Sequence, residues 1–277
     1  MGGFVSRARH HRSFTLGAAL AMALAGMALL SLVWTPWPVA GIEVAQKLRP
    51  PSLGHWFGTD NLGRDILSLI LAGAQNSILV GVIAVGIGLV FGVVLGLLAA
   101  ARRGWVEELV MRAADFTFAF PALLSAIMLT SLWGPGIVDS ILAIGIFNIP
   151  VFARITRAAA NGVYSREFIL GARVAGKGGV AISLEHVLPN IAPALIVQAT
   201  IQFATAILAE AALSYLGLGT QPPLPSWGRM LSEAQTLMFQ APQLAVYPGI
   251  AIALAVLGLN LLGDGLRDVL DPRLRGR

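Results

Sequence analysis

The chain has 277 residues, of which 56% are apolar and 12% are charged, and its mean hydropathy is +0.77. A soluble domain typically carries about 25% charged residues. This composition therefore excludes an ordinary globular protein and predicts an all-α integral membrane protein. The sequence contains no cysteine, which excludes disulfides, thiolate metal sites, iron–sulfur clusters and a cysteine nucleophile.

Six apolar runs predict membrane spans, because a helix needs roughly 20 apolar residues to cross a bilayer. They cover residues 13–34, 76–101, 119–133, 137–153, 191–213 and 245–262. The third and fourth runs are short and share a turn at residues 134–136. We expect these two to form a helical hairpin whose tilt and polar ends absorb the mismatch.

The first run resembles a signal peptide in one respect, since three arginines precede it. Its apolar stretch is about 20 residues long, however, and it lacks a clear small-residue cleavage site. Pro36 and Pro38 follow it. We therefore expect an uncleaved spanning helix.

The positive charges fall in alternate loops and predict the orientation of the spans. Fifteen of the 19 Lys and Arg residues lie in residues 1–12, 102–118, 154–190 and 263–277. Because cytoplasmic loops carry the excess of Lys and Arg, both termini are predicted to be cytoplasmic, whereas residues 35–75 and 214–244 face the periplasm. The isoelectric point near 10.4 then reflects inside loops facing anionic lipid. Nucleic-acid binding is not needed to explain it.

Glycines at four-residue spacing mark one face of the second span. Gly88, Gly92 and Gly96 form this ladder, and Gly81 lies on nearly the same stripe. In lipid, helices associate through the close packing of small residues. Glycine is also commoner in membrane helices generally, but the regular spacing favours a helix–helix contact face.

The two loops predicted to face outward are rich in turn-forming residues. Residues 35–75 contain HWFGTDNLGRD at positions 55–65 and lead through a short amphipathic helix into the second span. Residues 214–244 contain QPPLPSWG at positions 221–228, where the prolines exclude a regular helix or sheet. Two alternatives remain open: the loops cap a pathway, or they pack on the outer ends of the helices.

The longest inside loop, residues 154–190, predicts two short helices. Ser165 is an N-cap candidate, and Glu167 in the first turn suits the positive end of the helix dipole. Small residues and one aromatic then recur on one face, at Phe168, Gly171, Ala172 and Ala175. Gly176 and the glycines after it end this helix, and a second helix covers residues 180–186. A face with so little side chain fits a ridge that the groove of another protein approaches closely; the alternative is packing on the inner ends of its own spans.

The same loop nearly contains a phosphate-binding motif. Residues 171–178 read GARVAGKG, but the motif ends in Ser or Thr and needs a preceding strand. Because Gly178 replaces the hydroxyl, the sequence predicts no nucleotide site. The 4 histidines have no metal-ligand spacing apart from a terminal pair, and no nucleophile motif is present. We expect neither a metal site nor a catalytic centre.

Polar side chains inside the predicted spans are candidate pathway residues, because such groups are unfavourable in lipid and usually functional. They are Asn148, Gln198, Gln202 and Glu210. An ionised glutamate facing lipid at mid-depth is unfavourable by about 2–3 kcal/mol or more, so Glu210 should face protein or water. It either lines a polar pathway or forms hydrogen bonds to an outer loop. Asp115 lies three residues from Arg112, a spacing that allows a structural ion pair.

The inside loop resembles the EAA loop of importer-type ABC permeases. Leu170-Gly171-Ala172 aligns with the Glu-Ala-Ala of that family, Gly176 with its glycine, and Leu188-Pro189 with its Leu-Pro. Leu170 stands where the family often has Glu, so a salt bridge from that Glu is not implied, and Glu167 is a candidate substitute. The resemblance implies that the loop couples the permease to an ATPase through Glu167, Phe168, Leu170, Gly171, Ala172, Arg173, Ala175, Gly176, His186, Leu188 and Pro189.

Longer motifs resemble the dipeptide, oligopeptide and nickel permease subfamily, and more specifically its C-type subunit. They are residues 55–65, 210–219 (EAALSYLGLG), 225–228 (PSWG) and 260–275 (NLLGDGLRDVLDPRLR). The resemblance implies six transmembrane helices, with a MetI-like core at residues 76–262 and an extra N-terminal helix. It also implies a multi-pass location in the bacterial inner membrane.

The resemblance further implies the partners and the mechanism. The partners are a homologous B-type permease, two cytoplasmic ATPase subunits that bind ATP and Mg²⁺, and an extracytoplasmic solute-binding protein; this chain binds no cofactor itself. The mechanism is ATP-driven alternating access for di- or oligopeptides. Nickel or another small solute is the alternative, and short peptides are favoured because the spans hold no metal-ligand cluster. A stand-alone secondary transporter would need paired intramembrane acids, and Glu210 alone is such a candidate.

Overall fold

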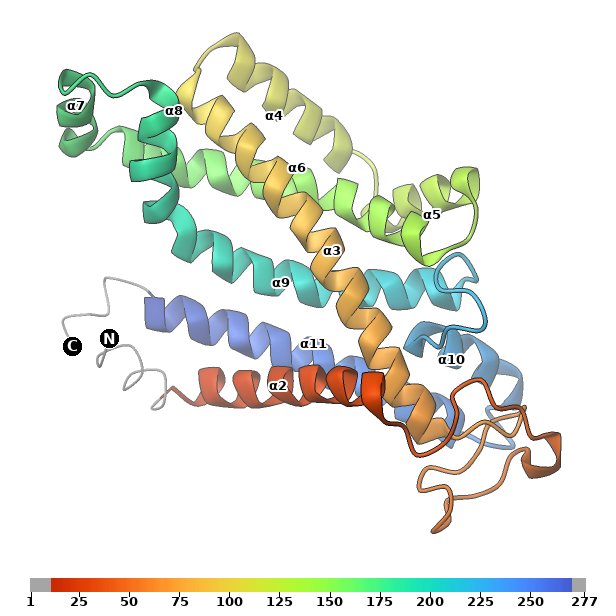
Figure 1. Cartoon of the computed structure of the whole chain (residues 1–277). Coiled ribbons are helices and arrows are strands. Elements are labelled where there is room, and N and C mark those ends of the chain that lie inside the picture. Colours follow the sequence, from red (N-terminus) through yellow and green to blue (C-terminus); the bar gives the residue numbers. More distant parts are fainter. Residues whose placement is uncertain (1–10, 271–277) are drawn as a thin grey trace.

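The computed structural model describes residues 11–270, and the regular structure there is helical apart from an isolated bridge between Thr59 and Asp65 (Figure 1). In chain order the helices are α2 (Arg12–Val33), the 3₁₀ turn η1 (Val44–Gln46), α3 (Ile66–Ala101), α4 (Trp105–Phe118), α5 (Ala122–Trp133), α6 (Ile137–Tyr164), α7 (Glu167–Val174), α8 (Gly179–Ile182), the π-helical turn η2 (Ser183–Val187), α9 (Leu188–Tyr215), α10 (Trp227–Ala234), the 3₁₀ turn η3 (Gln235–Leu237) and α11 (Gln243–Leu270). The outermost parts of the predicted terminal segments, and the end of the motif at 260–275, lie outside the described residues.

The predicted membrane class is confirmed by the length and apolar character of these helices. Among the described residues, 5 helices are long and apolar enough to cross a membrane, or 6 if the bent pair of α4 and α5 forms one span. Four of them are α2, α3, α6 and α11, and the fifth runs from Gly179 to Tyr215 through α8, η2 and α9. The first predicted span agrees with α2 to within one residue at each end.

The prediction for the third span is wrong in its extent. The helix within residues 119–133 is α5, which has 12 residues, and a helix of that length is only about 18 Å long. It meets α4 at a bend of 86°. Pro121 lies in the break, where its ring removes a backbone donor and restricts Phe120 to extended conformations.

Other predicted boundaries are too short, because apolar composition marks the buried length of a span and not the end of its helix. The second span begins at Ile66, ten residues before the predicted start, and the expected amphipathic helix is simply its first turns. Asp65 caps it by accepting a hydrogen bond from the Ser68 backbone N–H at 2.8 Å. The fourth, fifth and sixth spans extend as α6, α9 and α11, which have 28 residues each.

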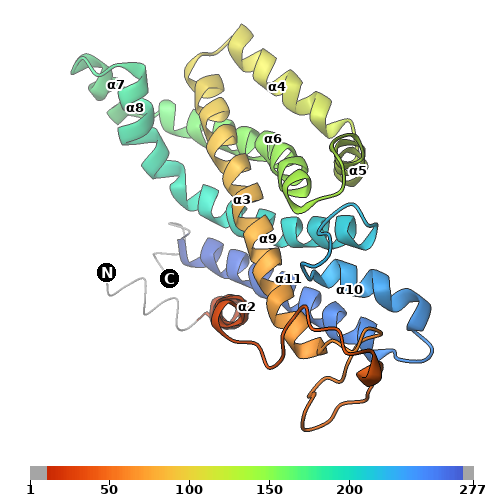
Figure 2. The same ribbon diagram turned by 45° about the vertical axis from the view of Figure 1, so that its right-hand side comes forward.

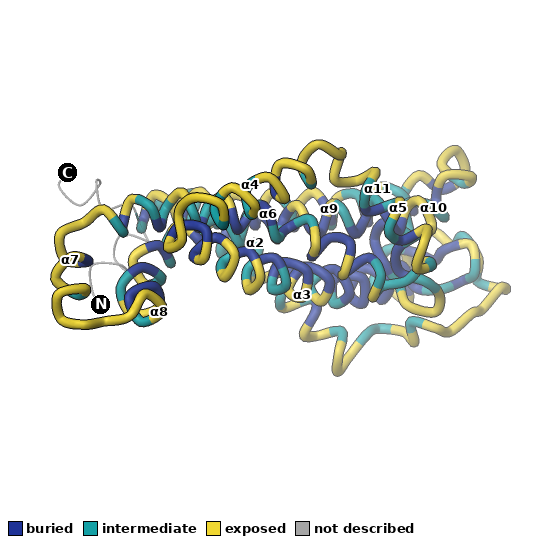
Figure 3. Tube along the Cα trace, turned by 90° about the horizontal axis from the view of Figure 1, so that it is seen from above, coloured by how far each residue is buried: buried dark blue, intermediate teal, exposed yellow. Residues whose placement is uncertain are grey.

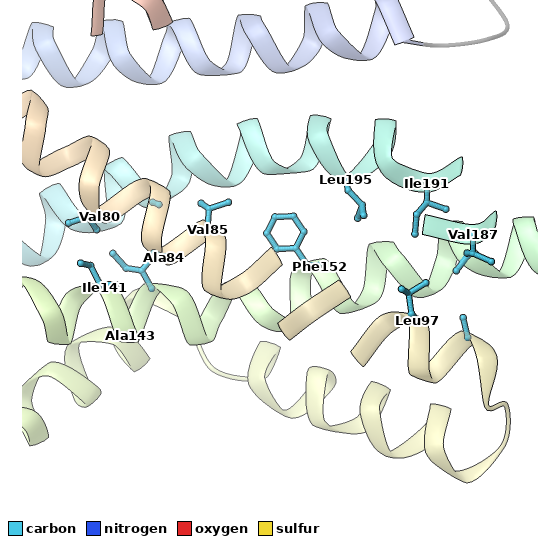
Figure 4. Packing of buried hydrophobic residues seen from close by; sticks show 14 of the residues in the cluster. Val80, Ala84, Val85, Leu97, Ile141, Ala143, Phe152, Val187, Ile191 and Leu195 are labelled. Atoms are coloured by element: carbon cyan, nitrogen blue, oxygen red, sulfur yellow. The ribbon is translucent and has the colours of Figure 1, made fainter. Parts of the chain in front are cut away.

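The glycine ladder of α3 is a contact face with α6, as predicted. An added Cβ at Gly92 would lie 2.5 Å from the Phe152 Cβ, and one at Gly96 would lie 2.5 Å from the Thr156 Cβ. Gly88 similarly faces Asn148. Gly81 differs, since its missing side chain makes room for the ring of Phe203 on α9. The apolar core of the molecule lies where these three helices meet (Figure 4).

Helix α2 packs on α11 and also contacts α3 (Figure 2). The contact with α11 again uses glycines: an added Cβ at Gly258 would lie 2.5 Å from the Leu20 Cβ, and one at Gly265 would lie 2.5 Å from the Phe14 Cα. The far face of α2 is apolar and exposed, with Val33 85% exposed. A lipid-facing surface accounts for that exposure.

The elements gather at two ends of the molecule. The α7 end contains α7, α8, the start of α2 and the end of α11, whereas the α10 end contains α5, α10 and the loop before α3 (Figure 1). Helix α4 is tied to α6 by ion pairs of Arg157 with Glu107 and of Arg154 with Asp115. The expected pair of Asp115 with Arg112 is therefore wrong, because Arg112 pairs with Glu108 one turn earlier in α4.

Candidate functional site

The segment at the α7 end leaves α6 and returns to α9 through a short exposed helix. Ser165 does not cap α7 as predicted; its hydroxyl donates to the Gly162 carbonyl at 3.1 Å, at the end of α6. Arg166 is the N-cap residue and provides no side-chain bond. Gly176, with φ +80°, reverses the chain just after α7, in the left-handed conformation that favours glycine.

Most of helix α7 is exposed to solvent (Figure 3), and its exposed apolar side chains form a ridge. Phe168, Leu170 and Val174 are 43%, 56% and 90% exposed. A Cβ added at Gly171 or Gly176 would meet no described atom within 4 Å. Of the predicted small face, Phe168, Gly171 and Ala175 are exposed, whereas Ala172 is half-buried against the core.

One fully buried side chain, Ile169, anchors α7 to the rest of the molecule. The remaining predicted contact residues surround the ridge. Glu167 and Arg173 are exposed, and no described residue forms an ion pair with Glu167. Pro189 occupies one of the first two positions of α9 and directly follows the π-helical turn η2 and Leu188.

His186, in the π-helical turn η2, links the residues after α7 to the start of α9. Its Nε2 lies 3.2 Å from the Lys177 Nζ, and its ring meets the Phe168 ring edge-on at 6.4 Å. Lys177 also forms an ion pair with Glu185. The predicted separate helix at residues 180–186 is not separate, because α8 continues through η2 into α9 without a break. Leu188, half-buried, begins α9.

A second candidate site is a groove of about 620 Å³ between α5, α6 and α9. Two of the four predicted pathway residues meet on its wall, where the Gln202 Nε2 donates to the Asn148 Oδ1 at 2.6 Å. Gln198 is half-buried and does not line this groove. The groove is otherwise almost entirely apolar.

Glu210 is the fourth candidate pathway residue. It does not line the groove, so its assignment as a pathway residue is corrected. It is fully buried, and its Oε1 accepts hydrogen bonds from three hydroxyl groups. These belong to Ser214 at 2.6 Å, Thr220 at 3.1 Å and Ser226 at 2.8 Å. The structure therefore favours the alternative, hydrogen bonding to an outer loop. Sequence reasoning missed these hydroxyls; only Ser214, one turn after Glu210, carried a local signal.

The two long loops pack on the ends of the helices at the α10 end. Trp227 is fully buried, and its Nε1 donates to the Ile70 carbonyl of α3 at 3.0 Å. Asn76 donates to the Pro225 carbonyl at 2.6 Å. In the other loop, His55 contacts the capping residue Asp65 at 3.0 Å. Of the two alternatives for these loops, packing on helix ends is the one that the contacts support directly.

Comparison with known proteins identifies the family. Residues 92–276 match the family described as binding-protein-dependent transport system inner membrane component. The chain belongs to this family. Members of this family are membrane components of transporters and not their catalytic subunits. The chain is called the permease below.

Two curated relatives confirm the resemblance predicted from the motifs. The permease is 42% identical over 249 residues to the dipeptide transport system permease protein DppC of Alkalihalophilus pseudofirmus, covering 90% of this chain and 82% of that protein. It is 50% identical over 226 residues to the glutathione transport system permease protein GsiD of Escherichia coli O157:H7, covering 82% and 75%.

A solved structure confirms the MetI-like fold. The permease resembles a chain of the MetNI methionine ABC transporter in an inward-facing conformation, with a TM-score of 0.63 over 73% of this chain and 97% of that chain. Sequence identity is 18%, so this likeness concerns the fold alone.

Proposed function

We propose that the permease is one of two membrane subunits of an ATP-driven importer of short peptides, and that α7 couples it to a cytoplasmic ATPase. The observation that carries the proposal is the ridge of α7. Its apolar side chains are exposed, and the space beside its glycines is not filled by other parts of the chain. Exposed apolar patches of this kind mark protein interaction sites. The segment is also the one that resembles the EAA loop.

The proposed cycle assigns the bond chemistry to partners. Two ATPase subunits bind ATP and Mg²⁺ and close on each other, and their grooves pull on α7 and on the matching helix of a homologous B-type permease. The permease pair then opens outward to accept the solute from a binding protein. Hydrolysis returns the pair to its inward-facing state, so this chain supplies half of the pathway and one coupling helix.

The orientation follows from charge. The loops predicted to be cytoplasmic by their Lys and Arg content include the α7 segment. Both termini and the ridge therefore face the cytoplasm, where an ATPase would reach them. Two relatives are named as dipeptide and glutathione transport permeases. These names support short peptides over nickel as the substrate class.

The first experiment places a bulky side chain on the ridge. Gly171→Trp should abolish peptide uptake by the reconstituted complex, with the permease pair still assembled, because the indole fills the space that the ATPase groove must occupy. Gly26→Trp is the matched control, since an added Cβ there also meets no described atom within 4 Å and Gly26 lies on the exposed face of α2. Unchanged uptake with Gly171→Trp would remove α7 as the coupling element.

A second measurement uses the absence of cysteine from the sequence. A single Val174→Cys variant, at a position 90% exposed, should cross-link to a co-purified ATPase subunit. It should also react with membrane-impermeant reagents only from the cytoplasmic side. Labelling from outside, or solute movement by the purified chain alone, would contradict the proposal.

A further inference from the structure

The groove between α5, α6 and α9 has one polar feature that can both donate and accept further hydrogen bonds. Its lining includes Asn148, Gln202 and Thr205, and the other lining residues are apolar. The Thr205 hydroxyl already donates to the Ile201 carbonyl of its own helix at 3.1 Å. The Thr205 oxygen can then only accept, so the two amides are the groups in this wall that can still donate a hydrogen bond to a molecule in the groove as well as accept one from it.

The amide pair has a fixed geometry near the middle of α6 and α9. Gln202 and Asn148 are 9% and 5% exposed, and they bond to each other at 2.6 Å. No described residue forms a further hydrogen bond with either amide. Exchanging the nitrogen and oxygen of both amides gives the same result: the pair keeps at least one free donor and one free acceptor.

The position of Asn148 is held from behind by α3. An added Cβ at Gly88 would lie 3.0 Å from the Asn148 carbonyl carbon, so the absence of that side chain lets α3 press against Asn148. No residue of α3 lines the groove. Asn148 thus lies between a rigid helix contact and the open groove.

We propose that the Asn148–Gln202 pair binds the backbone of the peptide during its passage. A peptide unit carries one N–H donor and one C=O acceptor, which complement the free acceptor and donor of the pair. Neutral amides bind this backbone without selecting for the charge of the peptide's side chains. The peptide's side chains would contact the apolar walls of the groove, which include Phe147 and Phe120. The inference rests on the proposed function and adds the substrate-contacting residues to it.

The test removes the pair and the matching peptide N–H separately. Gln202→Met and Asn148→Leu are each reconstituted with both permeases, the ATPase and the binding protein. Uptake is measured for a short peptide and for its backbone N-methylated counterpart. Each variant should lower uptake of the unmodified peptide about three- to tenfold, the usual effect of one lost hydrogen bond. Uptake of the methylated peptide, relative to wild type, should fall by a clearly smaller factor, because that peptide lacks the N–H and can lose only its C=O bond to the pair.

Taking the ratio of variant to wild type for each peptide cancels the contribution of the binding protein, because for a given peptide that contribution is the same in variant and wild type. Thr200→Val is the matched control, because it lies on α9, outside this groove, and its hydroxyl is bonded to the Val197 carbonyl at 2.7 Å. It should change uptake of both peptides equally. If one amide variant does not assemble, the other decides the outcome.

Three results would overturn the inference. One is an equal loss for both peptides, which would make the pair a purely structural link between α6 and α9. Another is unchanged uptake of both. The third is loss of the partner permease on purification of both variants, which would assign the pair to the subunit interface. A wild-type complex that moves no peptide would instead refute the proposed function.

Discussion

The two ends of the molecule satisfy their polar and apolar groups in different ways. At the α10 end, Glu210 and Trp227 are fully buried and bonded to loop and helix partners within the chain. At the α7 end, Ile169 is the fully buried side chain of α7, and Phe168 and Val174 are exposed. Buried polar groups need partners, and the α10 end supplies them internally for the Glu210 Oε1 and the Trp227 Nε1, whereas the Glu210 Oε2 has none among the described residues.

The difference lies in the internal bonding and not in apolar exposure alone, because the α10 end also exposes Leu53 and Leu132, by 98% and 79%. The α10 end has the internal bonding of a folded core, so its shape is set by the chain itself. The α7 end leaves apolar surface in water, which is unfavourable unless another protein covers it. Substitutions should therefore affect folding at the α10 end and transport at the α7 end.

The largest contrast is expected from the same substitution at both ends. Gly228→Leu should prevent recovery of folded permease, because an added Cβ at Gly228 would lie 2.6 Å from the Ala211 Cα and separate α10 from α9. Gly171→Leu should leave stability unchanged or raise it by up to about 1 kcal/mol, since leucine is the better helix former. Thermal unfolding in detergent measures both. Equal losses of stability would remove the distinction between the ends.

A smaller effect is expected at Glu210. Glu210→Ala leaves three buried hydroxyls without their acceptor and should lower the free energy of unfolding by about 3 kcal/mol or more. Glu210→Gln keeps one acceptor oxygen, and should lose clearly less. Guanidinium unfolding of the two variants tests the difference. If alanine and glutamine behave alike, the hydroxyl contacts do not hold the loop to α9.

Features that repeat along one helix could be predicted from the sequence. The spacing of Gly88, Gly92 and Gly96 indicated a contact face, and the structure places α6 against it. The exposed α7 segment was located by its small residues and its likeness to the EAA loop. Such patterns are readable because the side chains of one helix face recur at fixed intervals.

Features that depend on where a loop returns could not be predicted. Ser226 reaches Glu210 only because the loop after α9 folds back on it, 16 residues along the chain. The partner of Gly81 was not predictable either, because the glycine stripe of α3 contacts two different helices, α6 and α9. The bend before α5 is an intermediate case, because Pro121 is a visible signal but its angle depends on packing.

The smallest effects are expected for ion pairs, and they sharpen the same comparison. Arg64 bonds to Asp60 at 2.6 Å and to Glu233 at 2.8 Å, linking the loop before α3 to α10. Its side chain is 17% exposed. Arg64→Gln should lower the free energy of unfolding by about 1–2 kcal/mol, because a half-buried network loses its central charge.

The control is the exposed pair at the other end. Lys177→Gln breaks the ion pair with Glu185, whose side chain is 55% exposed, and should give no measurable change in the unfolding temperature, as is common for solvated pairs. High salt should reduce the effect of Arg64→Gln only partly, because the partly buried Arg64 network is weakly screened. A loss for Lys177→Gln as large as that for Arg64→Gln would mean that the α7 segment is held by the chain itself. The ridge would then not need a partner to complete it.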